Sequence, residues 1–225
     1  MDKRLMTCAR LCVGKRIADI GTDHGYLPCY MVENGMCETA LACDVAQKPL
    51  ESAREHIQAS GLGEKITALI SDGLERVPLD GVSDIVIAGM GGELIARILE
   101  SCAAVASGEK RVNLVLQPMT KWDVLREWLY EHDFEVKREI ACEEGRFVYS
   151  VMQAEYMGRK PEYRCDLRYK YFGRIKGSDT ESKLYLSRQA ARLRAAAQGK
   201  LAAGEEEQAK KMIALAEAVM AEVSK

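Results

Sequence analysis

The stretch "IADIGTDHGYLP", residues 17–28, decides the fold of this chain. An apolar run that reads as a buried strand ends in a glycine turn, and a helical pattern follows. That order is typical of the first strand, loop and helix of a nucleotide-binding α/β domain. The loop keeps Gly21 and Gly25, but an acid, Asp23, stands between them. A ligand bound at this loop must therefore tolerate a negative charge.

Apolar runs alternate with helical patterns through the first two-thirds of the chain. The runs that read as buried strands are residues 16–20, 39–45, 65–71, 84–90 and 112–118, the last closed by Pro118. Helical patterns fall at residues 25–34, 47–61, 91–106 and 120–133. Buried strands joined by helices form a parallel sheet with both faces covered. Two further strands around "EEGR" in 134–156 predict an antiparallel hairpin, so we expect a Rossmann-like, mostly parallel seven-stranded sheet.

The chain changes character at residue 157, and we predict two domains, 1–156 and 157–225. Ser178 and Glu181 match a capping box at the start of a helix, and "GKLAAG" (199–204) is expected to break that helix. Apolar residues recur at three- and four-residue spacing on both sides of the break: Leu186, Ala190, Leu193, Ala197, Ala209, Met212, Ala216, Val219 and Val223. This spacing predicts an antiparallel helical hairpin packed as a coiled coil.

Composition narrows the class of protein. The chain has 225 residues, of which 48% are hydrophobic and 29% charged, and its formal net charge is −2. Eight cysteines include no CxxC pair and only three histidines are present, so we expect reduced thiols and no metal site. No apolar run is long enough to span a membrane, and the N-terminus does not resemble a signal peptide. We therefore expect a cytoplasmic protein with no membrane partner.

Three acids mark the carboxyl ends of the first three predicted strands. Asp44 follows Asp19 by the spacing expected of an acid that binds ribose hydroxyls, and Asp72 stands where it can receive an adenine amino group. The alternative is that Asp44 and Asp72 are ordinary loop acids that cap the next helix. A carboxylate at Asp23 repels a pyrophosphate, and no GKS/T lysine is present. The charges therefore favour S-adenosylmethionine, whose sulfonium and ammonium are positive, over NAD.

Five motifs, "ADIGTDHGYLP", "ACDV", "SDGLE", "IAGMGG" and "LVLQP", occur in this order ahead of the helical hairpin. In these motifs the sequence resembles the bacterial TrmK family, which are class I S-adenosylmethionine-dependent methyltransferases that modify N1 of adenine 22 in tRNA. The resemblance implies a methyltransferase domain and a helical domain that helps to hold tRNA. The expected cofactor-binding residues are Asp19, Gly21, Asp23, Gly25, Asp44, Val45, Asp72, Gly73, Ala88, Gly89 and Met90.

The expected catalytic residues are Asp23, His24 and Tyr26. Adenine N1 carries its own in-plane lone pair, so positioning and exclusion of water matter more than a base. Asp23 can stabilise the cationic product, His24 can take a proton from N6, and Tyr26 can stack on the base. Each of the three has an alternative role in capping or supporting the loop. "AGMGG" lacks the Asn or Asp that many amino-methylating enzymes carry after the fourth strand, so backbone groups must serve there.

Acids outnumber bases in residues 1–155, and bases outnumber acids in residues 156–225. This asymmetry is consistent with an anionic partner for the tail, and composition alone favours the alternative of a solvated helical surface. The expected tRNA contacts are Arg159, Lys160, Arg164, Arg168, Lys170, Arg174, Lys176, Arg188 and Arg192. The interleaved Tyr163, Tyr169 and Tyr171 serve either RNA or a core between the domains. Other functions consistent with the sequence are methylation of another RNA or a small molecule, a non-catalytic S-adenosylmethionine-binding interaction protein, and an NAD oxidoreductase.

Overall fold

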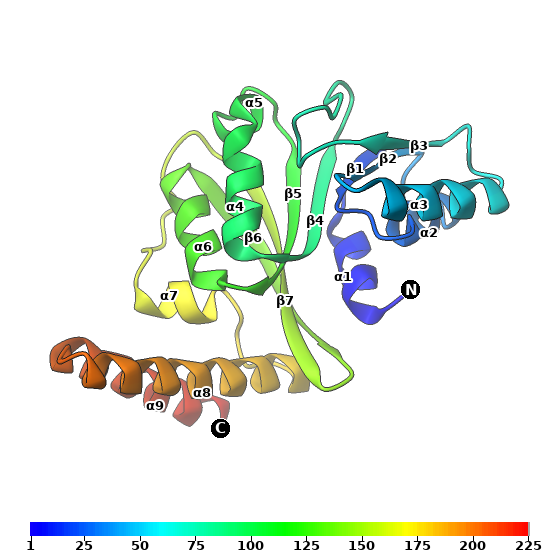
Figure 1. Ribbon diagram of the computed structural model, residues 1–225. Coiled ribbons are helices and arrows are strands. Elements are labelled where there is room, and N and C mark those ends of the chain that lie inside the picture. The colour runs from blue at the N-terminus through cyan, green and yellow to red at the C-terminus, as the bar shows by residue number, and fades with distance from the viewer. Residues whose placement is uncertain (225) are drawn as a thin grey trace.

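A computed structural model describes residues 1–224 and contains one seven-stranded sheet in the order β3-β2-β1-β4-β5-β7-β6 (Figure 1). Strands β1 to β5 are parallel, and β7 pairs antiparallel with both β5 and β6. The strands are β1 (Arg16–Ile20), β2 (Thr39–Asp44), β3 (Ile66–Ile70), β4 (Asp84–Gly91), β5 (Asn113–Thr120), β6 (Phe134–Glu144) and β7 (Phe147–Tyr156). The predicted Rossmann-like sheet with a terminal antiparallel hairpin is confirmed.

Helices cover both faces of the sheet, which explains why its strands are continuously apolar. One face packs against α1 (Lys3–Leu11), α2 (Tyr26–Glu33) and α3 (Gln47–Ala59). The other packs against α4 (Gly92–Ser101), α5 (Ala103–Ala106) and α6 (Trp122–Glu131). Successive strand residues alternate between these two cores. Within the described residues 1–224, no helix is both long and apolar enough to cross a membrane.

Two boundaries differ from the sequence prediction. Strand β5 continues through Pro118 to Thr120, whereas the sequence predicted that it closes at the proline. Pairing with β7 stops at Leu116, so the missing N–H of Pro118 costs no hydrogen bond to that neighbour. The single helix expected over 91–106 is divided at Cys102, which adopts a non-helical backbone between α4 and α5.

The tail contains a short helix, α7 (Leu167–Phe172), and an antiparallel pair, α8 (Thr180–Ala202) and α9 (Glu206–Val223). The predicted helical hairpin is confirmed, and eight of the predicted seam residues are buried, while Val223 is partly buried. The predicted cap is wrong: Asp179, not Ser178, caps α8, because its carboxylate accepts from the Ser182 N–H at 2.8 Å. The predicted break within "GKLAAG" is confirmed: α8 runs through Gly199 and ends at Ala202, inside that segment.

The helical hairpin packs on the β6–β7 strands, where Ala141 and Val148 join its core. A fully buried ion pair holds this junction: Arg126 of α6 donates to Glu139 of β6 at 2.6 Å. The same guanidinium donates to the Lys170 carbonyl at 2.7 Å and to the Tyr185 hydroxyl at 2.8 Å. One side chain thereby links α6, β6, α7 and α8.

The tyrosines of the basic segment belong mainly to this junction. Tyr169 is buried, and its hydroxyl lies 3.3 Å from that of Tyr163, which accepts from the Val136 N–H. Tyr171 is partly buried against the hairpin core. The interpretation of these residues as a core between the domains is therefore the one that the hydrogen bonds and burial support.

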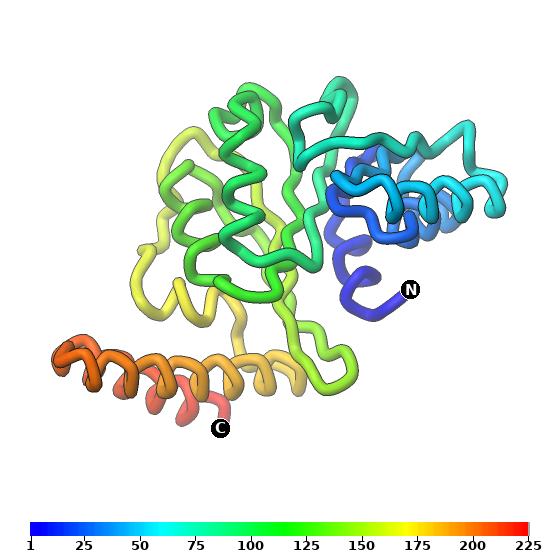
Figure 2. Tube along the Cα trace, in the orientation of Figure 1, coloured from blue at the N-terminus to red at the C-terminus, as the bar shows by residue number. Residues whose placement is uncertain are grey.

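The chain folds back so that its N-terminus lies at the same edge as the β6–β7 turn (Figure 2). The Lys3 N–H donates to Glu144 at 2.7 Å, and the Lys3 ammonium pairs with Glu181 of α8. Helix α1 therefore contacts the sheet, the turn and the helical hairpin.

Candidate functional site

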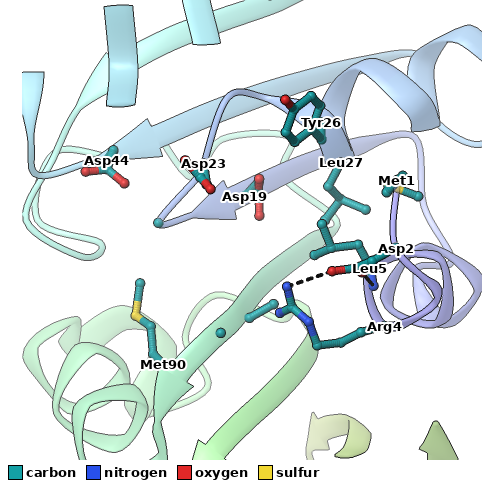
Figure 3. Close-up of a pocket in the computed structure, with 13 residues that line it drawn as sticks. Met1, Asp2, Arg4, Leu5, Asp19, Asp23, Tyr26, Leu27, Asp44 and Met90 are labelled. Carbon is teal, nitrogen blue, oxygen red and sulfur yellow. Dashed lines mark hydrogen bonds and ion pairs between the residues drawn. The ribbon is translucent and has the colours of Figure 1, made fainter. Parts of the chain in front are cut away.

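A cavity of about 580 Å³ opens at the carboxyl ends of β1, β2 and β4, where the strand order reverses (Figure 3). Ligands of open α/β sheets bind at this position because loops on either side of the reversal diverge. Its walls are formed by Met1, Asp2, Arg4, Leu5, Asp19, Gly21, Asp23, Tyr26, Leu27, Asp44, Ala88, Gly89 and Met90. Eight of the predicted site residues thus meet in one cavity.

The β1–α2 loop needs backbone conformations that glycine supplies. Gly21 has φ +77°, and a Cβ there would lie 2.2 Å from the Met90 methyl carbon. The positive φ favours glycine here, whereas the flexible Met90 side chain could move away from a Cβ. His24 and Gly25 follow in left-handed conformation, at φ +57° and +67°, and turn the chain into α2.

Asp19 is the buried acid of the cavity, with 6% of its surface exposed. Burial raises its pKa from 3.8 to about 6, because the charged form loses hydration. The guanidinium of Arg4 offsets part of this rise, and the carboxylate of Asp44 adds to it. A positively charged ligand group beside Asp19 would stabilise its charged carboxylate.

Asp23 and Asp44 place two more carboxylates on the wall. Asp44 at the end of β2 accepts from the Ala46 N–H at 2.7 Å, so its carboxylate also orders the turn into α3. Asp23 is exposed at the mouth and lies 3.2 Å from the His24 Nε2. Among the side chains of the wall residues in the described chain, four carboxylates face one cationic group, the guanidinium of Arg4. This charge balance suits a cationic ligand and disfavours a pyrophosphate.

Helix α1 forms part of the wall, and no motif in the sequence indicated this. Asp2 caps α1 through the Leu5 N–H at 2.7 Å and pairs with Arg4 at 3.2 Å. Arg4 donates to the side-chain oxygen of Gln117 at 2.7 Å. An acid shortly before a basic residue in "MDKRL" was the available signal, but it does not reveal which distant strand the arginine reaches.

A β-bulge interrupts the carboxyl-terminal end of β4. The register between β4 and β5 shifts between Ala88 and Met90, and Gly89 adopts φ +82° there. The Gly89 N–H donates to Gln117 at 3.1 Å, so Gln117 holds both this bulge and Arg4. A Cβ at Gly89 would lie 3.3 Å from the Arg4 guanidinium. Gln117 of the neighbouring strand thus fixes the backbone of "AGMGG", although its own side chain is fully buried and does not line the cavity.

Some predicted residues lie outside the cavity wall. His24, Gly25 and Val45 belong to the flanking turns, and Val45 is exposed. Asp72 lines a separate, smaller cavity against α4, where Gly73 packs close to Ile98. Their proposed interactions with a cofactor stay predictions. In the described part of the chain no group of three His, Cys, Asp or Glu side chains has a metal-binding arrangement.

Most of the basic residues predicted to hold RNA have acidic partners. The pairs are Arg159 with Glu162, Lys160 with Asp133, Arg168 with Glu222, Lys170 with Glu127 and Arg174 with Glu135. Arg188 donates to the Arg146 carbonyl, and Arg192 stacks over Trp122 at 4.6 Å. Arg164 and Lys176 are exposed. Part of the tail's positive charge is thus balanced by the acidic body on which it packs.

The segment that carries Arg159 and Lys160 starts at the end of the sheet opposite the cavity, where the parallel strands begin. It follows Tyr156 of β7, whose neighbour Glu155 pairs with Asn113 at the start of β5. Helix α8 instead begins beside α1 and the β6–β7 turn, at the cavity edge. The predicted basic surface is therefore divided between the two ends of the sheet, one beside the cavity and one opposite it.

Comparison with known proteins agrees with this site. A family model described as "Methyltransferase domain" matches residues 1–152. The tRNA (adenine(22)-N(1))-methyltransferase of Bacillus subtilis is 40% identical over 164 residues, covering 72% of this chain and 68% of that protein. The solved structure of B. subtilis TrmK, an m1A22 tRNA methyltransferase, superimposes with a TM-score of 0.83 at 30% identity, covering 98% of both chains.

Two further solved structures contain ligands. Sp1610 of Streptococcus pneumoniae, in complex with S-adenosyl-L-methionine, matches with a TM-score of 0.82 at 32% identity, over 98% of this chain and 99% of that one. TrmK of M. capricolum, in complex with S-adenosyl-homocysteine, matches with a TM-score of 0.80 at 25% identity, over 97% of both chains.

The reversed strand order and the acidic cavity at the strand ends, together with these likenesses, define a class I S-adenosylmethionine-dependent methyltransferase. Within that class, the chain belongs to the TrmK family of tRNA (adenine(22)-N(1))-methyltransferases. The resemblance that the five motifs indicated is confirmed.

Proposed function

We propose that this protein transfers a methyl group from S-adenosylmethionine to N1 of adenine 22 in tRNA. The observation that carries the proposal is the acidic cavity at the ends of β1, β2 and β4, in a chain 40% identical to an enzyme of that name. Four carboxylates with one guanidinium match a ligand that carries two positive groups and one carboxylate.

The residues present fit this cofactor. Asp19 is buried and has a raised pKa, so the ammonium of the methionyl part would stabilise its charged form most. Arg4 is placed to pair with the carboxylate of the methionyl part. Asp44 lies where it can accept from the ribose hydroxyls. S-adenosylmethionine supplies an electrophilic methyl on a sulfonium. Gly21 and Gly89 line the same cavity without a Cβ, and so allow the cofactor to approach the backbone closely.

The protein's task at the adenine is mainly positioning. N1 has a free lone pair once its base pair is opened, so no proton must leave before the methyl arrives. Asp23 at the cavity mouth can then stabilise the positive charge that develops on the ring. Tyr26, which is 46% exposed beside it, offers a ring for the base to stack on, and His24 can accept a proton from N6.

Helix α8 is the favoured tRNA-binding element, because it starts at the cavity edge and carries Arg188 and Arg192. The remaining candidates are Arg164 and Lys176, since the other five predicted tRNA-binding residues already pair with acids. We also propose that residues 1–156 and 157–225 form two domains, with α7 packed on α6 where they meet. Because the substrate is tRNA, we propose that the protein acts in the cytoplasm.

Methylation mapping tests the reaction. Pure protein, labelled S-adenosylmethionine and unmodified tRNA should yield 1-methyladenine at position 22. A tRNA with guanine at position 22 is the matched control and should yield no product. A different methylated base, or product from free adenosine but none from tRNA, would contradict the proposal.

Charge-neutral variants test the tRNA surface. Replacing Arg188 and Arg192 by glutamine should weaken tRNA binding and reduce the slope of log K against log salt by about one for each phosphate that the variant no longer neutralises. The control replaces Lys210 and Lys211 of α9, which pair with Glu206 and Glu207, by glutamine. Equal tRNA affinity in both variants would remove α8 from the binding surface.

A further inference from the structure

His56 of α3 makes a hydrogen bond to the catalytic loop that no motif indicated. Its ring Nδ1 lies 2.8 Å from the His24 carbonyl oxygen, 32 residues away in sequence. A carbonyl oxygen only accepts hydrogen bonds, so Nδ1 carries the proton and donates. This bond joins the last turn of α3 to the loop that carries Asp23.

The loop needs such support at this point. His24 has φ +57°, a left-handed conformation that costs a residue with a Cβ about 1–2 kcal/mol. Gly25, the next residue, is also left-handed and gives α2 no side-chain cap. Earlier in the loop, the N–H groups of Gly21 and Thr22 both donate to the Cys43 carbonyl. The His56 bond fastens the other half of the turn, after Asp23.

His56 also contacts the aromatic ring that follows the turn. Its ring meets Tyr26 edge-on, with ring centres 5.1 Å apart and an interplanar angle of 63°. The Tyr26 ring in turn lies 5.4 Å from that of His24. Edge-to-face packing of this kind restricts a ring that is otherwise free to rotate. One side chain therefore touches the backbone on one side of the turn and the ring on the other.

We propose that His56 is a positioning residue, which holds the Asp23–Tyr26 turn in the conformation that receives the target adenine. This inference rests on the proposed function, since it assigns Asp23 and Tyr26 to the adenine. His56 itself does not line the cofactor cavity. Its removal should therefore affect turnover on tRNA much more than cofactor affinity.

Two substitutions separate the hydrogen bond from the ring packing. His56→Asn keeps an N–H donor close to the position of Nδ1, whereas His56→Phe keeps an aromatic edge against Tyr26 but has no donor. We expect His56→Phe to lower kcat on tRNA about tenfold or more, because small misplacements of reacting groups are costly. His56→Asn should restore most of that activity. The Kd for S-adenosyl-homocysteine should change less than about threefold in both variants, because His56 lies outside the cavity wall.

His132→Phe is the matched control. His132 also places Nδ1 against a carbonyl, that of Trp128 at 2.9 Å, but at the end of α6, away from the cavity wall. It should leave kcat unchanged. Wild-type kcat in His56→Phe, equal losses of kcat in the Asn and Phe variants, or a loss that follows the fall in Tm would each overturn the proposal.

Amide NMR spectra distinguish this failure from failure of the proposed function. In His56→Phe the amide signals of residues 23–26 should shift or broaden while those of β4 stay in place. That readout does not depend on which substrate the wild-type enzyme methylates. Unchanged signals at residues 23–26 would overturn the positioning role, whereas a wild-type enzyme inactive on tRNA would contradict the proposed reaction alone.

Discussion

Arg4 of α1 donates a hydrogen bond of 2.7 Å to Gln117 of β5, 113 residues away, and so faces the cofactor cavity. Gln117 is fully buried and accepts from the Gly89 N–H as well. The Arg4 guanidinium at the cavity wall and the bulge within β4 thus both donate to the same Gln117 oxygen.

Arg4→Gln should weaken S-adenosylmethionine binding about tenfold, because the variant cannot make a charge-assisted hydrogen bond to the methionyl carboxylate. Isothermal titration calorimetry measures the effect. Arg10→Gln, at an exposed position in the last turn of the same helix, is the control and should bind as the wild type does. Equal affinity in the two variants would show that Arg4 does not contact the cofactor.

Gly89→Ala should lower cofactor affinity, since a Cβ at φ +82° strains the bulge and presses on Arg4 from 3.3 Å. The strain itself costs about 1–2 kcal/mol of stability. Gly61→Ala is the matched control, because Gly61 has φ +67° but open space around its Cβ position. Both variants should lose stability in thermal unfolding, and only Gly89→Ala should lose affinity. If Gly89→Ala bound the cofactor as well as Gly61→Ala does, the tight fit at Gly89 would be contradicted.

Cofactor binding should strengthen as pH rises through about 6. Asp19 in the folded protein has a pKa raised from 3.8 to about 6 by burial, so the ammonium of the cofactor meets a carboxylate only above that range. Binding isotherms measured from well below to well above the Asp19 pKa give the dependence. In Asp19→Asn the dependence should disappear and affinity should be low throughout. An unchanged pH profile in this variant would assign the effect to another group.

Protein stability without cofactor should change with pH in the opposite sense. Because the folded state binds the Asp19 proton more tightly than the unfolded state, stability falls as pH rises from about 4 to about 6. Above a pH of about 6, burial of the charged Asp19 lowers the free energy of unfolding by about 3 kcal/mol. Asp19→Asn should therefore raise Tm at slightly alkaline pH while impairing binding. A lower Tm in this variant would contradict the desolvation argument.

Arg126→Met should destabilise the protein by about 3–5 kcal/mol, because it leaves the buried Glu139 carboxylate without its cation. The Lys170 carbonyl and the Tyr185 hydroxyl lose their donor in the same variant. Urea unfolding measures the change in free energy. Lys15→Met, which breaks the exposed pair with Glu38, is the control and should be neutral. A neutral Arg126→Met would show that the junction does not depend on this ion pair.

The strand–loop–helix pattern at residues 17–28 and the acids after the first two strands were sufficient to predict the sheet and most of the cavity. Parallel strands end at one edge, so Asp19, Asp23 and Asp44 had to meet there once the strand pattern was correct. The local sequence pattern predicted the ends of helices and strands less reliably. Asp179 rather than Ser178 caps α8, since the competing capping signals are adjacent and equally suited to the role.

The sequence by itself determined the class of fold, the acidic loop and the helical hairpin, because hydrophobic period and local charge are properties of short segments. Tertiary structure alone decided that Arg4 reaches the cavity, that Gln117 bonds to the bulge of β4, and that His56 bonds to the turn after β1. It also decided that five of the basic residues predicted to contact tRNA pair with acids. These interactions mostly join segments far apart in the chain, and only packing of the whole sheet brings them within hydrogen-bonding distance.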